Sequence, residues 1–516
     1  MIRKILSVML LGTTVLTTNA QTQVTNGDFE TWTYDGNNMP NNWNSFQTAD
    51  GSLASTVYSS SNRQVQKSTD IRPGSTGQSS VRIWTRTVIG IPAQGNLTSG
   101  RVHAGSMSAA NKENYNYSDR DGKNTNNGVE NPCAMKFTGH PDAVSVWVKF
   151  NRQGGDNTAR FAAFIHDDHD YITYGLESYD NATNKSYVVA SAEQNFEPCD
   201  WTNLVLPFNY TGNEDAKYVL INASTSSYPG KGKKDDELYI DDIEMIYYHA
   251  LSDLKYNGQT VAGFNEETKD YDLTDQVYDE SKVSWTVKGH AATVSKAFNA
   301  TTGKLRLTVK NNDSGESTVY TLSFKTASAT LFVSTAAKYA TFIAPFNLST
   351  PSSIPVDAYT VDNINANGTL VMTKLGKNIP ANTPVVLYST RTSDYTRTAS
   401  GAFVPATNNL TEGLLTGTYE EINAPVDSYV MQNHDGRVGF FHVAAGKQPK
   451  VAPNRCYLTV PAGSAAPAFF FEGDETNGIG NVEMTTDNTI YDLQGRRVAT
   501  PTKGLYIING KKVVIR

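Results

Sequence analysis

The chain has 516 residues, which is too long for one domain, because domains usually hold about 100–200 residues. Charged residues make up 18% of it and the formal net charge is −7, a balance that argues against nucleic acid as a partner. Three cysteines are too few for a disulfide framework, so stability must come from packed cores. The sequence leaves open whether Cys133 and Cys199, which fall in one predicted domain, form a pair.

The first twenty residues have the pattern of a secretory signal peptide. Arg3 and Lys4 give a positive start, an apolar core follows at 5–16, and small residues end at Ala20. The core is too short to span a bilayer, which needs about 20 apolar residues. We therefore expect cleavage near Ala20, export, and a mature chain with no transmembrane segment.

The remaining chain has the pattern of short β-strands separated by polar turns. One predicted strand places Val144, Val146 and Val148 on one face and Trp147 on the other. Turn signals such as Asn-Gly at 26–27 separate stretches of this kind. We therefore predict an all-β fold made of sandwich domains.

Changes in composition and spacing divide the chain into segments. In chain order we expect a signal peptide at 1–20, a β-sandwich at 21–249, an immunoglobulin-like β-sandwich at 250–327, a β-rich domain at 328–472, a polar linker at 473–489 and a small β module at 490–516. Within the first sandwich, residues 96–131 are rich in Asn, Gly, Ser and Asp, and we expect a long irregular loop there.

The first sandwich resembles a known family. It contains, in order, "VTNGDFETW", "GNLTSGRVHAGSMSA", "FTGHPDAVSVWVKF" and "DELYIDDIEMIYY". Together these stretches resemble the carbohydrate metabolism domain of Bacteroidetes surface proteins. The resemblance implies a jelly-roll β-sandwich of the kind seen in carbohydrate-binding modules, with a polysaccharide or oligosaccharide as its partner.

The C-terminal module carries a second resemblance. "IYDLQGRRV" followed by "GLYIINGKKVVIR" resembles the C-terminal sorting domain of the type IX secretion system. The matching positions are Gly495, Arg496, Gly504, Tyr506, Lys511 and Lys512. The resemblance implies passage across the outer membrane, and then release or attachment at the cell surface. The alternative is an ordinary terminal hairpin with a turn at Asn509-Gly510.

The two ends of the first sandwich also suggest a metal. Jelly-roll modules with an "NGDFE" start and "DD" in the last strand commonly hold structural calcium, so the resemblance implies a Ca²⁺ site at Glu30, Asp241 and Asp242. Calcium takes about 6–8 oxygen ligands. Strand alternation places Asp242 on the face of Leu238, which we expect to be buried, and a buried carboxylate needs a partner or a cation. The alternative is hydrogen bonding of Asp242 to turn amides.

A second candidate metal site is the run His166-Asp167-Asp168-His169-Asp170. Its side chains suit zinc or calcium. The spacing matches no recognised metal signature, however, and an acidic turn in water is the alternative.

Sugar binding needs aromatic faces with polar groups beside them. The candidate ligand-binding residues are Trp147, Trp84, Tyr115 and Tyr117, with Trp201 as a further aromatic residue and Arg101 and His103 as polar neighbours. Trp147 is the most suggestive, because it lies opposite the predicted core face. The alternative is that these aromatic residues pack in the core.

These observations favour a secreted or cell-surface glycan-binding protein. One alternative is a carbohydrate-active enzyme, which needs two carboxylates about 5 Å or about 6.5–9.5 Å apart. The available residues are Glu113, Glu130, Glu177 and Glu193, and no spacing pairs any two of them. We therefore favour binding over catalysis. A structural or adhesive surface protein is the other alternative.

Overall fold

The computed structural model describes residues 22–33, 38–57, 63–120, 125–126, 129–130, 133–174, 182–349, 356–366, 368–434, 436–461, 466–471, 490–491, 497–498, 502–508 and 511–515. The predicted signal peptide and linker lie outside these residues, as do Glu177, Gly495, Arg496 and the Asn509-Gly510 turn. The three cysteines are free, so Cys133 and Cys199 do not form a pair.

The prediction of an all-β chain is confirmed. In the described residues, helix is confined to α1 (Ala54–Val57), α2 (Ala182–Ser186) and the 3-10 turns Phe46–Thr48 and Glu280–Lys282. None of the helices described is long and apolar enough to cross a membrane.

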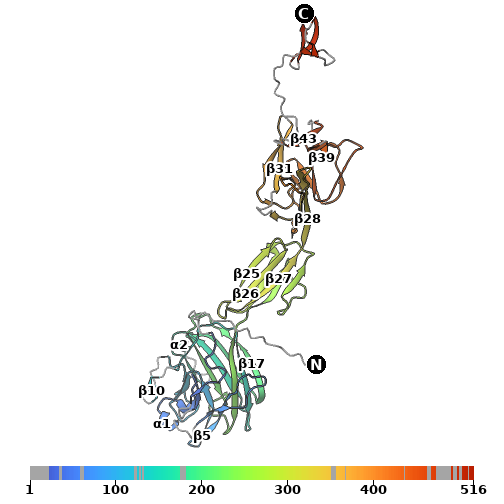
Figure 1. Cartoon of the computed structure of the whole chain (residues 1–516). Helices are drawn as coiled ribbons and strands as arrows, with labels where there is room; N and C mark the ends of the chain where they lie inside the picture. Colours follow the sequence, from blue (N-terminus) through green and yellow to red (C-terminus); the bar gives the residue numbers. More distant parts are fainter. Residues whose placement is uncertain are drawn as a thin grey trace. The chain divides into compact units, whose positions relative to one another are not determined.

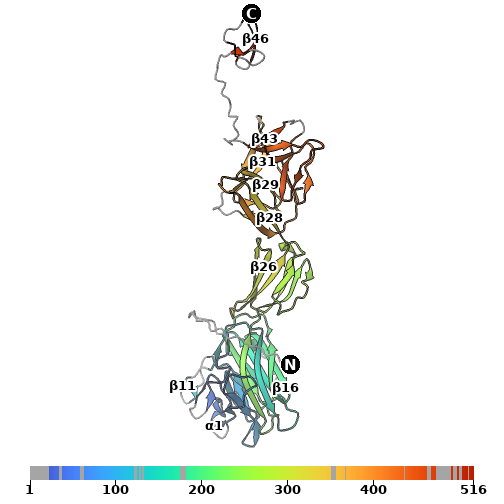
Figure 2. The ribbon, with the colours of Figure 1, turned by 45° about the vertical axis from the view of Figure 1, so that its right-hand side comes forward.

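The N-terminal domain is a sandwich of two sheets. The six-stranded sheet contains β12 (Met135–Lys136), β19 (Tyr218–Ser224), β14 (Ala159–His166), β16 (Val188–Phe196) and β18 (Asn209–Tyr210) in that order, with β7 (Asn96–Thr98) beside β19. The five-stranded sheet has the order β17 (Cys199–Pro207), β13 (Ala143–Asn151), β20 (Glu237–Ile246), β4 (Ser80–Trp84) and β3 (Val65–Ser68). Early and late strands are neighbours here, so blue and green ribbons lie together in Figure 2.

The main core lies between these two sheets. Val144, Val146 and Val148 of β13 are fully buried in it, which confirms the predicted alternation of that strand. From the other sheet, Phe161 and Ile165 of β14 enter the same cluster. Because side chains alternate along a strand, the residues between them face away from the core on the outer surface of each sheet.

Part of the outer surface of the six-stranded sheet is covered by a third layer. This layer is a sheet of β15 (Ile172–Tyr174), β9 (Asn114–Tyr117) and β8 (Arg101–Ala104). Next to it, Tyr171 packs with Phe164 and Leu220 in a small apolar cluster. The remaining short strands of the domain are β1 (Trp32–Thr33), β2 (Met39–Pro40), β5 (Arg86–Val88), β6 (Ile91–Ala93), β10 (Thr125–Asn126) and β11 (Val129–Glu130). The predicted irregular loop at 96–131 is therefore wrong in part, because β7, β8 and β9 lie within it.

The reason for this error lies in the small apolar residues of that segment. Leu97 packs into the main core, and Val102 and Ala104 form a separate cluster with Ala49. The side-chain amide of Asn114 binds the backbone of the connection between β8 and β9: its oxygen accepts from the N–H of Gly105, and its nitrogen donates to the carbonyl of Ser106. A composition typical of loops thus forms strands, because neighbouring segments bury its few apolar side chains.

The chain divides into two compact units. The first draws on residues 1–269, 281–296 and 307–320, and includes, besides the N-terminal domain, a sheet of β22 (Gln259–Thr260), β21 (Ala250–Tyr256) and β24 (Val283–Lys288). Residues between 270 and 324 also form β23 (Asp270–Leu273), β27 (Ser317–Phe324), β26 (Lys304–Asn311) and β25 (Ala292–Asn299).

The second unit is β-rich throughout its described part (Figure 1). Its largest sheet has the order β29 (Tyr339–Phe342), β34 (Val385–Ser389), β31 (Val356–Ile364), β32 (Thr369–Lys374), β43 (Ala468–Phe471), β40 (Arg437–His442), β39 (Tyr429–His434), β42 (Arg455–Leu458), β37 (Leu415–Thr418) and β36 (Thr411–Glu412). Paired strands beside it are β28 (Thr326–Val333) with β35 (Tyr395–Ala402), β30 (Leu348–Ser349) with β33 (Asn378–Ile379), and β38 (Ile422–Asn423) with β41 (Lys450–Val451). The C-terminal strands are β44 (Ile490–Tyr491), β45 (Arg497–Val498), β46 (Gly504–Ile508) and β47 (Lys511–Ile515).

Candidate functional site

A pocket of about 180 Å³ opens on the outer surface of the six-stranded sheet, where the third layer leaves it uncovered. Its floor is formed by strand residues that alternate with core residues, namely Asn96, Arg160, Ala162, Asn222 and Ser224. Its walls come from α1, the β5–β6 hairpin, β8 and β9. Figure 1 shows α1 and β5 at the same edge of the domain. The pocket therefore joins segments that are far apart in the sequence.

The floor contains amide groups without hydrogen-bond partners. Asn222 is only 8% exposed, and in the described structure neither its donor Nδ2 nor its acceptor Oδ1 has a hydrogen-bond partner. Oδ1 of Asn96 and Oε1 of Gln94, which also line the pocket, are buried without partners as well. Buried polar groups are nearly always paired, and an unpaired one costs about 1–3 kcal/mol. These amides are suited to a ligand that supplies both donors and acceptors.

One wall of the pocket carries two stacked rings. His103 on β8 and Tyr115 on β9 are cross-strand partners, with ring centroids 4.6 Å apart and planes at 14°. Nδ1 of His103 lies 2.8 Å from Oδ1 of Asp50, and the hydroxyl of Tyr117 donates to Oδ2 of the same carboxylate at 2.6 Å. Asp50 therefore fixes the orientation of His103, and through the stacked pair that of Tyr115.

Two of the predicted sugar-binding residues, Arg101 and Tyr117, support this wall and do not line the pocket. Arg101 is buried and its Nε lies 2.6 Å from Oδ2 of Asp119, which is also buried. Burial raises the pKa of Tyr117, and its hydrogen bond to Asp50 raises it further, so this hydroxyl keeps its proton as a donor. Of the six predicted ligand-binding residues, the pocket thus brings together His103 and Tyr115.

The predicted tryptophans lie elsewhere, on the outer surface of the five-stranded sheet. Trp147 is half-buried on the face opposite the core, as its strand alternation predicted, and the guanidinium of Arg72 lies 5.2 Å from its ring centroid. Trp84 is buried, with the guanidinium of Arg82 at 4.6 Å from its ring. On the same surface, Nε1 of Trp201 donates to Asp70. Cationic and acidic side chains therefore occupy the neighbourhood of these rings.

Two of the three carboxylates of the predicted calcium site, those of Glu30 and Asp242, have partners of their own. Oε1 of Glu30 accepts from the backbone N–H groups of Gln78 and Ser79, at 2.7 and 2.8 Å. Asp242 forms an ion pair with Arg72. The described residues contain no group of three or more His, Cys, Asp or Glu side chains arranged to hold a metal ion. The calcium site stays a prediction.

The expected face of Asp242 is wrong. The pairing of β13 with β20 shifts register between Ser145 and Trp147, and Asp242 has a left-handed φ of 44°. This β-bulge places two residues opposite one, so the alternation changes phase. Asp241 lies before the bulge, opposite Trp147 on the face away from the core, and is nevertheless the buried carboxylate. It is 1% exposed, and its Oδ2 has no hydrogen-bond partner in the described structure. Burial raises the pKa of Asp241 to about 7, and the neighbouring Asp242 adds to the effect.

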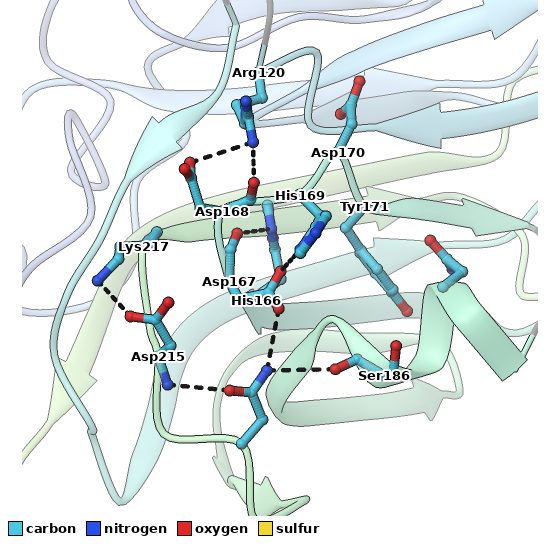
Figure 3. Close-up of polar contacts among 12 residues, drawn as sticks. Arg120, His166, Asp167, Asp168, His169, Asp170, Tyr171, Ser186, Asp215 and Lys217 are labelled. Atoms are coloured by element: carbon cyan, nitrogen blue, oxygen red, sulfur yellow. Dashed lines mark hydrogen bonds and ion pairs between the residues drawn. The ribbon is translucent and has the colours of Figure 1, made fainter.

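The His166–Asp170 run forms contacts mainly with other side chains (Figure 3). Nδ1 of His169 lies 2.7 Å from Oδ1 of Asp167, and its ring stacks on Tyr187. Asp168 pairs with Arg120. His166 is fully buried, and this burial lowers its pKa to about 4, so the ring is neutral at pH 7.

No carboxylate lines the described part of the pocket. Among the four candidate glutamates, Glu193 does not line the pocket but forms an ion pair with Arg160, which does. Glu113 is exposed and does not line the pocket either. The side chain of Glu130 and the whole of Glu177 lie outside the described residues. The described lining therefore lacks the two facing carboxylates that glycoside hydrolysis requires.

No protein-family model matches the sequence, and no curated protein matches it. Three solved structures are similar to parts of the chain. The carbohydrate-binding module CBM28, specific for non-crystalline cellulose, is 9% identical, with 45% of this chain and 99% of that chain covered and a TM-score of 0.20. The K1 adhesin domain of Lys-gingipain from Porphyromonas gingivalis W83 is 10% identical over 42% and 94%, with a TM-score of 0.20. The α-L-arabinofuranosidase MgGH51 is 10% identical over 44% of this chain and 26% of its own length, with a TM-score of 0.23. TM-scores this low do not establish a shared fold.

Proposed function

We propose that the chain is an exported glycan-binding protein whose N-terminal domain holds carbohydrate in the pocket over β14 and β19. The observation that carries this proposal is the buried amide of Asn222, which has no hydrogen-bond partner in the described structure and lies in the same pocket as the stacked rings of His103 and Tyr115. Sugars combine hydroxyl groups, which both donate and accept, with apolar C–H faces. The pocket offers a matching surface for each.

The size of the pocket bears on the length of the glycan. Clefts that hold drug-sized ligands measure about 300–1,000 Å³, whereas this pocket measures about 180 Å³. It suits the end of a glycan or a short branch rather than a long run of sugar rings. The signal-peptide pattern and the resemblance of 490–516 to a sorting domain support a location outside the cell, where such glycan ends are accessible.

The residues that line the pocket favour glycan binding over the two alternative functions. Glycosidase chemistry would require facing carboxylates, and the described lining has none. A purely structural role would give no reason to keep a buried, unpaired amide, since an apolar residue of similar shape at that position would remove its cost.

The test is binding of the mature full-length chain to a glycan array, followed by calorimetry on the glycans retained. We expect Tyr115→Ala to weaken binding at least tenfold, because one wall of the pocket is lost. Trp147→Ala is the matched control, since Trp147 lies on the other sheet, and it should leave the affinity unchanged. Failure of the folded chain to bind any glycan, or equal affinity of the Tyr115→Ala variant, would refute the proposal.

A further inference from the structure

The mouth of the pocket is surrounded by exposed apolar side chains. Among the apolar residues of the lining, Ile91, Pro92 and Met107 are exposed and Ala109 and Pro229 are half-buried. They come from the β5–β6 hairpin, the connection between β8 and β9, and the loop after β19. Of these, Ile91 is 38% and Met107 is 43% exposed. Large apolar side chains gathered on a surface mark a contact site. We call this group the apolar rim.

The tip of the hairpin has an unfavourable backbone for its residue type. The hairpin turns through Ile89 and Gly90, both with positive φ, of 48° and 77°. Two-residue turns of this type favour Asn-Gly, because β-branched residues rarely adopt positive φ. Here the turn instead holds an exposed isoleucine next to the pocket. Backbone strain of this kind concentrates at ligand sites, where the surrounding structure maintains it.

The floor and the rim together define what a ligand must carry. Asn222 presents an amide N–H group and an amide oxygen, so its partner must both accept and donate. The apolar rim requires a nonpolar group a short distance away. An acetamido group has all three features, because its carbonyl accepts, its N–H donates and its methyl group is apolar. A sugar with hydroxyl groups alone has C–H faces but no methyl group to place against the rim.

The charges of the pocket argue against an acidic sugar. The basic side chains in the described lining are Arg160 and His103. Arg160 forms an ion pair with Glu193, and His103 is held by Asp50. Each basic side chain therefore has a carboxylate beside it, which weakens the attraction of the pocket for a uronic acid or a sulfate.

We propose that the pocket selects a sugar bearing an acetamido group, that is, an N-acetylhexosamine residue at the end of a glycan. This inference rests on the proposed glycan binding and specifies its ligand. Nδ2 of Asn222 donates to the acetamido carbonyl, and the acetamido N–H, which points the opposite way in a trans amide, donates to a second partnerless acceptor, Oδ1 of Asn96 or Oε1 of Gln94. The apolar rim receives the methyl group, and the stacked pair of Tyr115 and His103 borders the ring.

The experiment compares ligands that differ only at the acetamido position. Three β-1,4-linked trimers serve, with an acetamido, an amino or a hydroxyl group at carbon 2 of each ring. Methyl N-acetylgalactosaminide and methyl galactoside form a second pair, with the other ring configuration. Affinities for the mature full-length chain are measured by calorimetry. We expect one acetamido ligand to bind at least tenfold more tightly than its partners without the acetyl group.

Two variants connect this preference to the pocket. Asn222→Ala should reduce the acetamido preference to less than threefold, and an unchanged thermal midpoint verifies its fold. Ile91→Ser changes a residue on the exposed hairpin and should weaken only the acetamido ligands. If ligands without the acetyl group bind equally well and depend on Tyr115, this inference fails while glycan binding stands. If no ligand binds here or on the glycan array, both fail.

Discussion

The carboxylate of Asp50 accepts the hydroxyl of Tyr117 at 2.6 Å and at the same time lies 2.8 Å from Nδ1 of His103. One acidic side chain thereby holds a buried tyrosine and a ring of the pocket wall. Tyr115 stacks on His103, and His103 is held by Asp50. The position of Tyr115 therefore depends indirectly on Asp50. Stability and binding are coupled at this point.

We predict that Asp50 and Tyr117 are energetically coupled. Tyr117→Phe and Asp50→Ala should each lower the free energy of unfolding by about 1–3 kcal/mol, because each leaves a buried group without its partner. The double variant should lose less than the sum of the two. Five of the six tryptophans precede residue 250, so tryptophan fluorescence during urea unfolding reports on this domain. Additive losses would contradict the coupling.

The buried ion pair of Arg101 with Asp119 gives a second prediction. Arg101→Ala leaves the Asp119 carboxylate buried without its counter-charge and should lower the free energy of unfolding by about 3–5 kcal/mol. Glu197→Ala is the control, since Glu197 is exposed in its pair with Arg152, and its effect should be far smaller. Equal effects of the two substitutions in the same urea experiment would show that burial of the pair is unimportant.

The raised pKa of Asp241 predicts a dependence of stability on pH. In the unfolded chain this carboxyl loses its proton near pH 4, whereas in the folded chain its pKa is about 7. Between these values the folded state binds more protons, so the contribution of Asp241 to the free energy of unfolding falls as pH rises from about 4 to about 7 and is constant above.

His166 acts in the opposite direction over part of this range. Its pKa is lowered to about 4 in the folded chain, so its contribution is present above pH 6.5 and is lost as pH falls towards 4. The informative measurement is therefore the difference in unfolding free energy between the wild type and Asp241→Asn across pH 4–8. The advantage of the variant should grow with pH up to about 7, and a flat difference would contradict the burial argument.

The predicted calcium ion can be tested at the same carboxylate. If Ca²⁺ binds the folded chain alone, it stabilises it by about 2.7 kcal/mol at a hundredfold excess over its dissociation constant. We expect the thermal midpoint to rise on addition of CaCl₂ and to fall with a chelator, and Asp241→Asn to abolish the shift. A midpoint that is the same with calcium and with chelator would rule the ion out.

Strand alternation was sufficient to predict much of the fold. It identified the inward face of β13, because a sheet with one buried side requires apolar residues at every second position. It failed at Asp242, because a β-bulge there inserts one residue and exchanges the two faces beyond it. The sequence has no marker of that bulge, since its cause is the pairing with β13.

The candidate site, too, could be predicted from the sequence only in part. Aromatic residues could be recognised as candidates one by one, but nothing in the sequence shows which of them lie together. In the structure Trp147 lies on the five-stranded sheet and Tyr115 in the three-stranded layer. Asn222, central to the proposed site, was missed, because it is an ordinary polar residue in a strand. Its only signal is the lack of a partner, which exists only once the strands are assembled.

The sequence by itself determined the all-β class and which residues of its regular strands face inward, because both follow from local alternation. Tertiary structure decided the pocket, since its lining comes from segments between Phe46 and Gly230 that meet only when the domain is assembled. It also decided which basic side chains lie beside carboxylates, because the partners of Arg160 and His103 come from other strands or loops. Side-chain pairing across distant segments is a property of the assembled sheets.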